Sequence, residues 1–245
     1  GANIVKIEGP AGDRHAGAMG AGGVMNGLPT LYTIAQLNKW TSSLDLKDPQ
    51  YKESISRLIQ QADVVMDNLR PGVVDRLGLG YETVRHQNTG IVSASSPAWG
   101  EQGPMSNVPG LDPEVQVFCG FASMNGEQGG APEMLRYPHL DFNASCFFAS
   151  SILLGLISRE RAGTGSRVTC SHLGSNIALL VTRISEFLAD GVTPGPAGSA
   201  SSSSAPHQFF RCSEGHYLAV GVETDEQWNS FCTALGKPDW LEDPR

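Results

Sequence analysis

One carboxylate stands directly ahead of a long apolar stretch: Asp141, in the run PHLDFNASCFFASSILLGLISRER that extends from Pro138 to Arg161. A carboxylate at this place has two roles open to it. It can cap the first turn of a helix, because its oxygens accept hydrogen bonds from free N–H groups and suit the positive end of the helix dipole. It can also act as a nucleophile in covalent catalysis. This stretch alone leaves both interpretations open.

Other residues able to do chemistry give weaker signals. Asp112 and Gln116 in LDPEVQ are compatible with a turn or a helix N-cap ahead of Pro113 as well as with a functional role. His139, two residues before Asp141, is retained only as an accessory base. The remaining histidines show no metal-ligand spacing, so we expect no metal site; they lie at 15, 86, 172, 207 and 216.

The elements that must position these residues follow from hydrophobic periodicity. Strands are predicted at 3–8, 63–68, 90–96 and 166–172, and helices at 48–62, 73–80, 81–87, 141–161 and 176–191. Alternating strands and helices indicate an α/β fold with a mostly parallel sheet. The stretch 141–161, apolar on nearly all sides, predicts a buried helix. Gly191 predicts the end of the last helix.

A Pro, Gly and Ser segment divides the chain. We predict a Rossmann-like large domain at 1–192, a linker at 193–206 and the beginning of a smaller α+β domain at 207–245, with a strand at 216–222 and a helix at 225–236. Within the linker, 195–204 fits a lid over the site or, preferably, a plain connection. The glycine-rich segment 9–27 has the wrong glycine order for a phosphate-binding G-x-G-x-x-G loop.

Composition limits the classes of partner. The 245 residues are 40% hydrophobic and carry a net charge of −8, so no broad basic field is present for nucleic acid or an anionic membrane surface. No run approaches the ~18 consecutive apolar residues of a membrane span. Five cysteines without a CxxC pattern are interpreted as buried thiols in a reducing compartment. We therefore predict a cytoplasmic protein. The absence of an initiator Met and of a closing element suggests a fragment lacking both ends.

Eight stretches along nearly the whole chain resemble the class III CoA-transferases, a family with formyl-CoA, carnitine and bile-acid-inducible members and with α-methylacyl-CoA racemases as relatives. The most specific are RPGVVDRLGLGYE and RERAGTGSRV. The other matching stretches are GANIVKIEGPAGD, NKWTSSLDLKDP, GEQGP, LDPEVQ, HLDFNA and GHYLAVGVETDEQW. The resemblance implies the Rossmann-like fold, an interlocked homodimer and further chain beyond both ends.

The resemblance also implies a reaction. Asp141 takes the family's nucleophile position and attacks an acyl-CoA thioester to give a mixed anhydride. The released CoA thiolate then forms an aspartyl-CoA thioester, and an acceptor carboxylic acid reverses these steps. We expect the helix N-terminus to keep the attacking carboxylate ionised.

Coenzyme A brings an adenine, a 3′-phosphate and a diphosphate, so its site needs a few cations and apolar walls. The chain offers three cations, two leucines as walls and one asparagine as a hydrogen-bonding partner. The predicted CoA residues are Leu44, Lys47, Asn68, Leu69, Arg70 and Arg76. By family position Lys47, Asn68, Leu69 and Arg76 match CoA contacts, and Arg70 is added for its charge. Leu69 stands where some members carry Phe, so a ring contact to adenine is lost.

Two alternatives differ in class. A racemase of this family uses a histidine immediately before the aspartate of the LDPEVQ stretch, but Leu111 occupies that position and cannot carry a proton. A non-catalytic CoA-binding protein is also compatible, because fold does not fix function. The sequence favours the transferase and leaves its acyl group and acceptor acid open.

Overall fold

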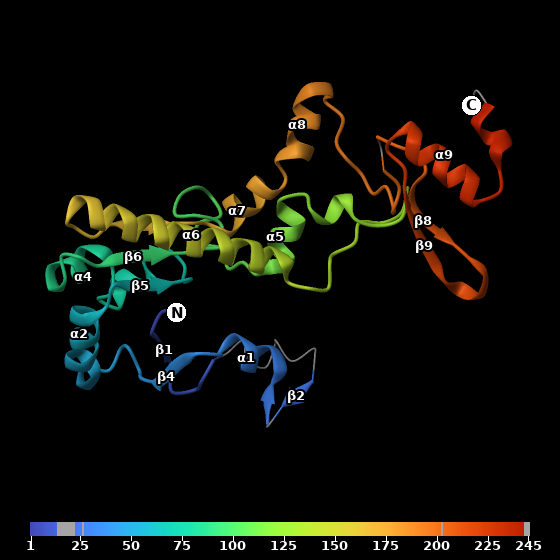
Figure 1. The fold of residues 1–245 in the computed structure, drawn as a ribbon. Coiled ribbons are helices and arrows are strands. Elements are labelled where there is room, and N and C mark those ends of the chain that lie inside the picture. The colour runs from blue at the N-terminus through green and yellow to red at the C-terminus, as the bar shows by residue number, and fades with distance from the viewer. Residues whose placement is uncertain (14–22, 26, 202, 243–245) are drawn as a thin grey trace. The chain divides into compact units, whose positions relative to one another are not determined.

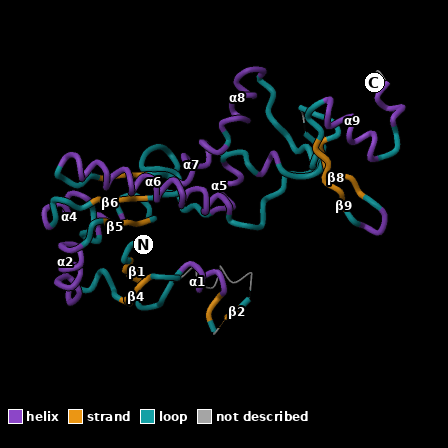
Figure 2. Tube along the Cα trace, viewed as in Figure 1, coloured by secondary structure: helices purple, strands orange, loops and turns teal. Residues whose placement is uncertain are grey.

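The computed structural model describes residues 1–13, 23–25, 27–201 and 203–242, with the elements labelled in Figure 1 and coloured by type in Figure 2. Residues 14–22 and 26 of the glycine-rich segment, with His15, lie outside this part of the chain, as does Ser202 of the proposed lid. The chain groups into two units, 1–97 with 148–169 and 98–147 with 170–245. The predicted domain division at 192 and 206 stays a prediction.

Parallel strand pairs characterise the first unit. A three-stranded parallel sheet has the order β5 (Val64–Asp67), β6 (Val92–Ser95) and β7 (Arg167–Thr169). A separate parallel pair joins β1 (Ile4–Glu8) to β4 (Lys39–Ser43), and a short antiparallel pair joins β2 (Val24–Met25) to β3 (Leu28–Pro29). These pairings confirm the predicted α/β class, with the parallel strands divided between two sheets.

Short helices connect these strands and supply the core of the first unit. They are α1 (Thr30–Ala35), α2 (Lys52–Gln61), α3 (Val73–Arg76) and α4 (Tyr81–Gln87). Ile59 of α2 and Val84 of α4 pack with Ile91, which precedes β6, and all three are buried. The predicted helices at 48–62, 73–80 and 81–87 are confirmed, with shorter bounds for the first two.

The GTG turn of the RERAGTGSRV stretch has a steric cause. Gly163 follows the end of α6 (His139–Ala162) with a φ of 74°, a left-handed conformation that favours glycine. A Cβ at Gly165 would lie 1.9 Å from the carbonyl oxygen of Ile91, so only glycine fits there. The turn therefore lets the chain pass directly from α6 into β7 against the start of β6.

In the second unit α5 (Asp112–Phe118) precedes α7 (His172–Leu179) and α8 (Val181–Asp190). The single helix predicted at 176–191 is wrong, because the chain turns at Leu180, and helix formation begins earlier, at His172. The strand predicted at 166–172 is correspondingly shorter and ends at Thr169. The helix end at Gly191 is confirmed, with a φ of 74°.

The remaining elements of the second unit are an antiparallel hairpin of β8 (His207–Arg211) and β9 (Tyr217–Gly221), followed by α9 (Asp225–Ala234). The predicted strand at 216–222 and helix at 225–236 are confirmed. The hydrophobic cluster of the second unit joins Trp99, Val115 of α5 and Leu140 of α6. Leu140 precedes Asp141, so this cluster anchors the candidate site.

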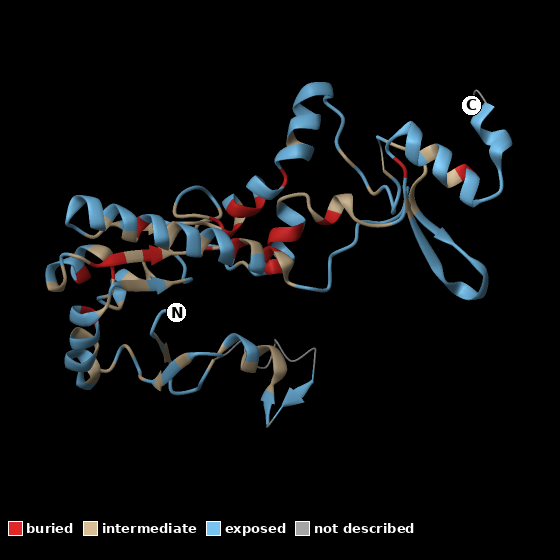
Figure 3. Ribbon diagram, in the orientation of Figure 1, coloured by how far each residue is buried: buried red, intermediate tan, exposed pale blue. Residues whose placement is uncertain are grey.

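The expectation that α6 is buried is wrong. Large apolar side chains along it are exposed, among them Phe147, Leu153, Leu154 and Ile157, and most of its ribbon is pale in Figure 3, in contrast to β6. By length and composition α6 could cross a membrane, with 17% of its most apolar window buried. This corrects the expectation that no such segment exists, although core helices of soluble proteins pass the same test.

The cysteines also depart from expectation. None of the five forms a disulfide, but only Cys232 is buried, while Cys146 and Cys212 are exposed and Cys119 and Cys170 are half-buried. Burial raises the pKa of the Cys119 thiol, which disfavours the reactive thiolate at that position.

Candidate active site

Asp141 lies in the first turn of α6 and not at its N-cap. The helix begins at His139, and the Phe142 N–H donates to the carbonyl oxygen of Pro138 at 3.2 Å. The backbone N–H of Asp141 donates to Oδ2 of Asp112 at 3.0 Å. Asp112 therefore satisfies a free N–H of this first turn, and the Asp141 side chain, which is 53% exposed, remains open to other contacts.

Asp112 is the first residue of α5 and is only 5% exposed. It is not the N-cap of its own helix; that position belongs to Leu111, whose N–H donates to Oε2 of Glu114 at 3.0 Å. Oδ1 of Asp112 accepts a hydrogen bond from Nε2 of Gln116. LDPEVQ is thus the start of a helix, and its buried carboxylate, Asp112, contacts the first turn of α6.

Gln116 extends this network to the segment before α6. Its Oε1 accepts from the Leu135 N–H at 2.9 Å, and its Nε2 donates to the Leu135 carbonyl at 3.2 Å. Gln116 is 1% exposed. A buried amide with both ends paired fixes its neighbours, because breaking either bond leaves a polar group without water.

His172, the first residue of α7, lies beside Asp141. Its Nε2 atom lies 3.2 Å from Oδ1 of Asp141, and the residue is 8% exposed. The direction is not that of a hydrogen bond, and Nε2 has no hydrogen-bond partner among the described residues. Sequence reasoning missed this residue because it placed His172 at the end of a strand. The signal was Ser171, whose side chain accepts from the Gly174 N–H as a helix N-cap.

Partial burial has an electrostatic consequence for Asp141. Loss of hydration raises the pKa of its carboxyl, His172 opposes the rise, and the nearby Asp112 carboxylate adds to it. The direction is opposite to the expected effect of the helix N-terminus. A raised pKa also makes the carboxylate more basic than that of an exposed aspartate.

One atom from each of Asp112, Asp141 and His172 lies within 4.8 Å of the others, a spacing that a divalent cation could span. Both oxygens of Asp112 already accept hydrogen bonds, from Gln116 and from the Asp141 N–H. A cation would have to displace these bonds. The donor set therefore fits a metal poorly, and the expected absence of one stays a prediction.

His139 does not share this contact with Asp141. Its Nδ1 lies 3.3 Å from the Tyr137 carbonyl oxygen, its ring packs on Phe121 with centroids 4.5 Å apart, and Nε2 is buried. Tyr137 in turn stacks on Phe142. The structure brings Asp141 together with Asp112 and His172, while His139 packs against an aromatic ring.

The predicted CoA residues belong to the first unit and follow strand ends. Leu44 and Lys47 come after β4, and the Leu44 N–H donates to the Glu8 carbonyl oxygen at 2.9 Å. Lys47 is exposed, with its backbone N–H bonded to Oδ1 of Asp45. Carboxyl ends of parallel strands are the usual ligand side of such sheets.

The other four follow β5 or end α3. Asn68, Leu69 and Arg70 are exposed directly after β5, where the Leu69 N–H donates to Oδ1 of Asp67 at 2.9 Å. Arg76 is the last residue of α3 and is exposed. Neither Lys47 nor Arg76 takes part in an ion pair between residues that the structure describes.

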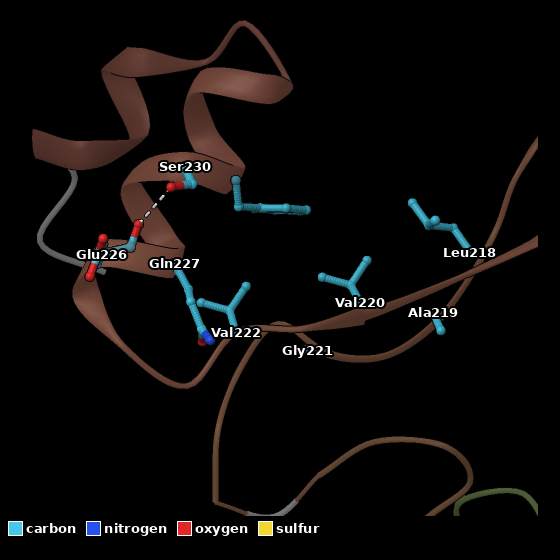
Figure 4. Close-up of a pocket in the computed structure, with 9 residues that line it drawn as sticks. Leu218, Ala219, Val220, Gly221, Val222, Glu226, Gln227 and Ser230 are labelled. Carbon is cyan, nitrogen blue, oxygen red and sulfur yellow. Dashed lines mark hydrogen bonds between the residues drawn. The ribbon is translucent and has the colours of Figure 1, made fainter.

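In the second unit a hollow of about 450 Å³ lies between β9 and α9. In Figure 4 Val220 of β9 and Val222, which follows β9, point toward α9, where Oγ of Ser230 donates to the Glu226 carbonyl oxygen. Its lining is mostly apolar and includes none of the predicted site residues. The hollow therefore gives no support to a catalytic role for this region.

A model described as CoA-transferase family III matches residues 1–245. An acyl-CoA transferase from Fusarium pseudograminearum is 31% identical over the whole chain, and a mouse succinyl-CoA:glutarate CoA-transferase is 28% identical over 99% of it. A crystal structure of a CAIB/BAIF family protein from Brucella suis superposes with a TM-score of 0.86 at 27% identity over the whole chain. The chain spans 55% of each curated relative and 65% of that solved chain.

Proposed function

Because the chain belongs to CoA-transferase family III, we propose that the full-length protein moves CoA from an acyl-CoA thioester to a carboxylic acid, with Asp141 as the nucleophile. The observation that supports this is the half-exposed carboxylate of Asp141, placed between buried polar residues of α5 and α7. Hydrogen bonds fix the backbone that carries the Asp141 carboxylate, and the exposure of the side chain leaves room for a substrate.

The proposed steps need neither water nor a net proton. A carboxylate oxygen of Asp141 attacks the thioester carbonyl, the C–S bond breaks, and CoA leaves as a thiolate. The thiolate then attacks the aspartyl carbonyl, and the donor acid leaves as a carboxylate. The acceptor carboxylate repeats these steps in reverse, which regenerates Asp141. Two covalent intermediates thus keep the thioester energy that hydrolysis would lose.

The CoA side of the proposal rests on the exposed cations of the first unit. Lys47 and Arg76 carry charge that the described residues do not neutralise, as phosphate recognition requires. Leu44 and Leu69 offer apolar surface for the adenine, and Leu69 is 38% exposed. Asn68 and Arg70 complete the proposed set at the end of β5.

The racemase alternative is disfavoured by the spacing at Asp141. Exchange of an α-proton with inversion needs one base on each face of the carbon. His172 is the titratable partner that the structure adds, but its Nε2 lies 3.2 Å from Oδ1 of Asp141. A substrate carbon does not fit between two atoms in contact. Asp141 and His172 can therefore reach only one face of the substrate carbon.

CoA exchange tests the proposal. The full-length protein is incubated with succinyl-CoA or acetyl-CoA and a panel of acids that includes glutarate, the acid in the name of the mouse relative. We expect acceptor-dependent formation of new acyl-CoA with ping-pong kinetics, and no α-deuterium in a 2-methylacyl-CoA incubated in deuterated water. Deuterium incorporation without acceptor-dependent exchange would contradict the transferase and restore the racemase. The homodimer stays a prediction that light scattering tests.

A further inference from the structure

His172 presents a polar atom that its surroundings do not satisfy. Its side chain is 10% exposed, and Nε2 is buried without a hydrogen-bond partner among the described residues. Buried polar atoms are normally paired, because an unpaired one costs the free energy of its lost hydration. Among the ion pairs of the described residues, His172 Nε2 takes part in one, with Oδ1 of Asp141 at 3.2 Å. The unsatisfied atom therefore faces the proposed nucleophile.

Hydrogen bonds between α6 and α7 fix this pair. Nδ2 of Asn176, which is 0% exposed, donates to the carbonyl oxygen of His172 at 2.9 Å and to that of Leu140 at 3.4 Å. Nδ2 of Asn143 donates to Oδ1 of Asn176 at 2.9 Å and to the Ser175 carbonyl at 3.1 Å. The residues before Asp141 and after it are thus tied to the first turns of α7.

We propose that His172 is a catalytic residue that donates a hydrogen bond from Nε2 to Oδ1 of Asp141 as negative charge forms on that oxygen. This inference rests on the proposed function, because a tetrahedral oxyanion at Oδ1 arises only if Asp141 forms covalent intermediates. The histidine then stabilises the tetrahedral species at the aspartyl carbonyl carbon.

The two oxygens of Asp141 have different roles in this scheme. The oxygen turned away from His172 attacks the acyl carbonyl and becomes the bridging oxygen of the anhydride. Oδ1 remains as the aspartyl carbonyl oxygen. When the CoA thiolate adds to the carbonyl carbon, an electron pair moves onto Oδ1, and it returns as the bond to the donor carboxylate breaks. No proton changes place, so a neutral imidazole with Nε2–H is sufficient.

To form this hydrogen bond the two side chains need only reorient, because the two atoms are already close enough. Nε2 and Oδ1 are already at 3.2 Å, and the Asp141 side chain is half exposed and free to rotate about its terminal torsion. Catalytic hydrogen bonds are often poorly aligned before substrate binds. Formation of the intermediate would thus satisfy the unpaired Nε2 atom.

Single-turnover kinetics of the full-length protein test this role. The enzyme is mixed with succinyl-CoA, and formation of the thioester on Asp141 is followed by rapid quench and mass spectrometry. His172→Leu removes the donor and keeps the apolar volume, and we expect a rate about 10²- to 10³-fold lower, as for loss of one oxyanion donor. His172→Gln restores an N–H donor and should recover at least roughly tenfold of that loss.

His139→Leu is the matched control, since His139 also has a buried Nε2 but packs on Phe121. We expect a rate within about threefold of the parent.

Two-bond ¹H–¹⁵N spectra of the free protein report which ring nitrogen of His172 carries the proton, which a purely structural role would not require to be Nε2. They should show His172 carrying a proton on Nε2. A bare Nε2, or a His172→Leu rate within about threefold of the parent, overturns the role of His172 while leaving Asp141 in place. A parent protein that forms no thioester overturns the proposed function, and this inference with it.

Discussion

The surroundings of Asp141 in the second unit and the predicted CoA residues of the first unit are built differently. Around Asp141 the polar neighbours Asp112, Gln116 and His172 are each at most 8% exposed. In the first unit Lys47 and Arg76 are exposed, and neither has an ion-pair partner within the described part of the chain. The first arrangement fixes the backbone that carries the reacting group before substrate arrives, and the second offers charge that can adapt to a ligand.

This difference leads to separate expectations for mutations. A buried network holds a group in its reactive geometry, so damage to it should lower turnover more than affinity. Exposed cations act through hydrogen bonds that form only when the ligand is bound, so removing one of them should lower affinity and leave turnover nearly unchanged. The four predictions below probe this separation, from the largest expected effect to the smallest.

The largest effect should come from the nucleophile itself. Asp141→Asn and Asp141→Ala should each lower CoA transfer by at least about 10³-fold, since covalent catalysis is lost, while CoA affinity changes by less than about threefold. Steady-state assays and calorimetric CoA titration measure the two quantities. Near-normal turnover by the Asn variant would reduce Asp141 to a structural residue of the first turn.

Loss of a CoA cation should act on affinity. Arg76→Ala should weaken CoA binding by roughly 1.5 to 3 kcal/mol, which is about 10- to 150-fold, because a charge-assisted hydrogen bond to phosphate is removed. Dephospho-CoA identifies which phosphate is involved. Arg85→Ala is the matched control, an exposed arginine of the same unit that pairs with Glu82 at 3.0 Å. Equal affinity of the Arg76 variant and the parent would remove Arg76 from the site.

The pH dependence should follow the raised pKa of Asp141. Only the carboxylate attacks, so a raised pKa moves the acid limb of kcat/KM above the range of an ordinary aspartate. Asp112→Asn keeps an acceptor for the Asp141 N–H but removes the negative charge that adds to this rise, and the limb should move to lower pH. An acid limb at the same or a higher pH in the variant would contradict the electrostatic role of Asp112.

The smallest effect concerns stability. A carboxyl whose pKa is raised by folding contributes stability below its unfolded pKa and loses it as pH rises through the folded value. At neutral pH the ionised Asp141 is thus unfavourable, and Asp141→Asn should melt slightly higher, by about 1 °C because solvent screens the half-exposed group. The difference should vanish in acid. A lower Tm at neutral pH would show that the charge stabilises the fold.

The sequence alone predicts much of this molecule, because its strands and short helices carry strong periodic patterns. Asp141 as nucleophile and four of the predicted CoA residues were proposed from the resemblance, since a carboxylate ahead of an apolar run is equally a helix cap. His172 was missed because SRVTCSH continues a strand-like pattern, whereas Ser171 ends it by capping α7. The exposure of α6 could not be predicted either, because hydrophobic periodicity shows which faces of a helix are apolar but not whether another element covers them.

The most direct test of the account is chemical trapping of Asp141. The full-length protein is incubated with acyl-CoA, treated with hydroxylamine and digested with trypsin, which releases residues 137–159 as one peptide. We predict a hydroxamate at Asp141 that depends on acyl-CoA and is absent from Asp141→Asn. An unmodified Asp141 in protein that nevertheless exchanges CoA between acids would contradict the covalent mechanism.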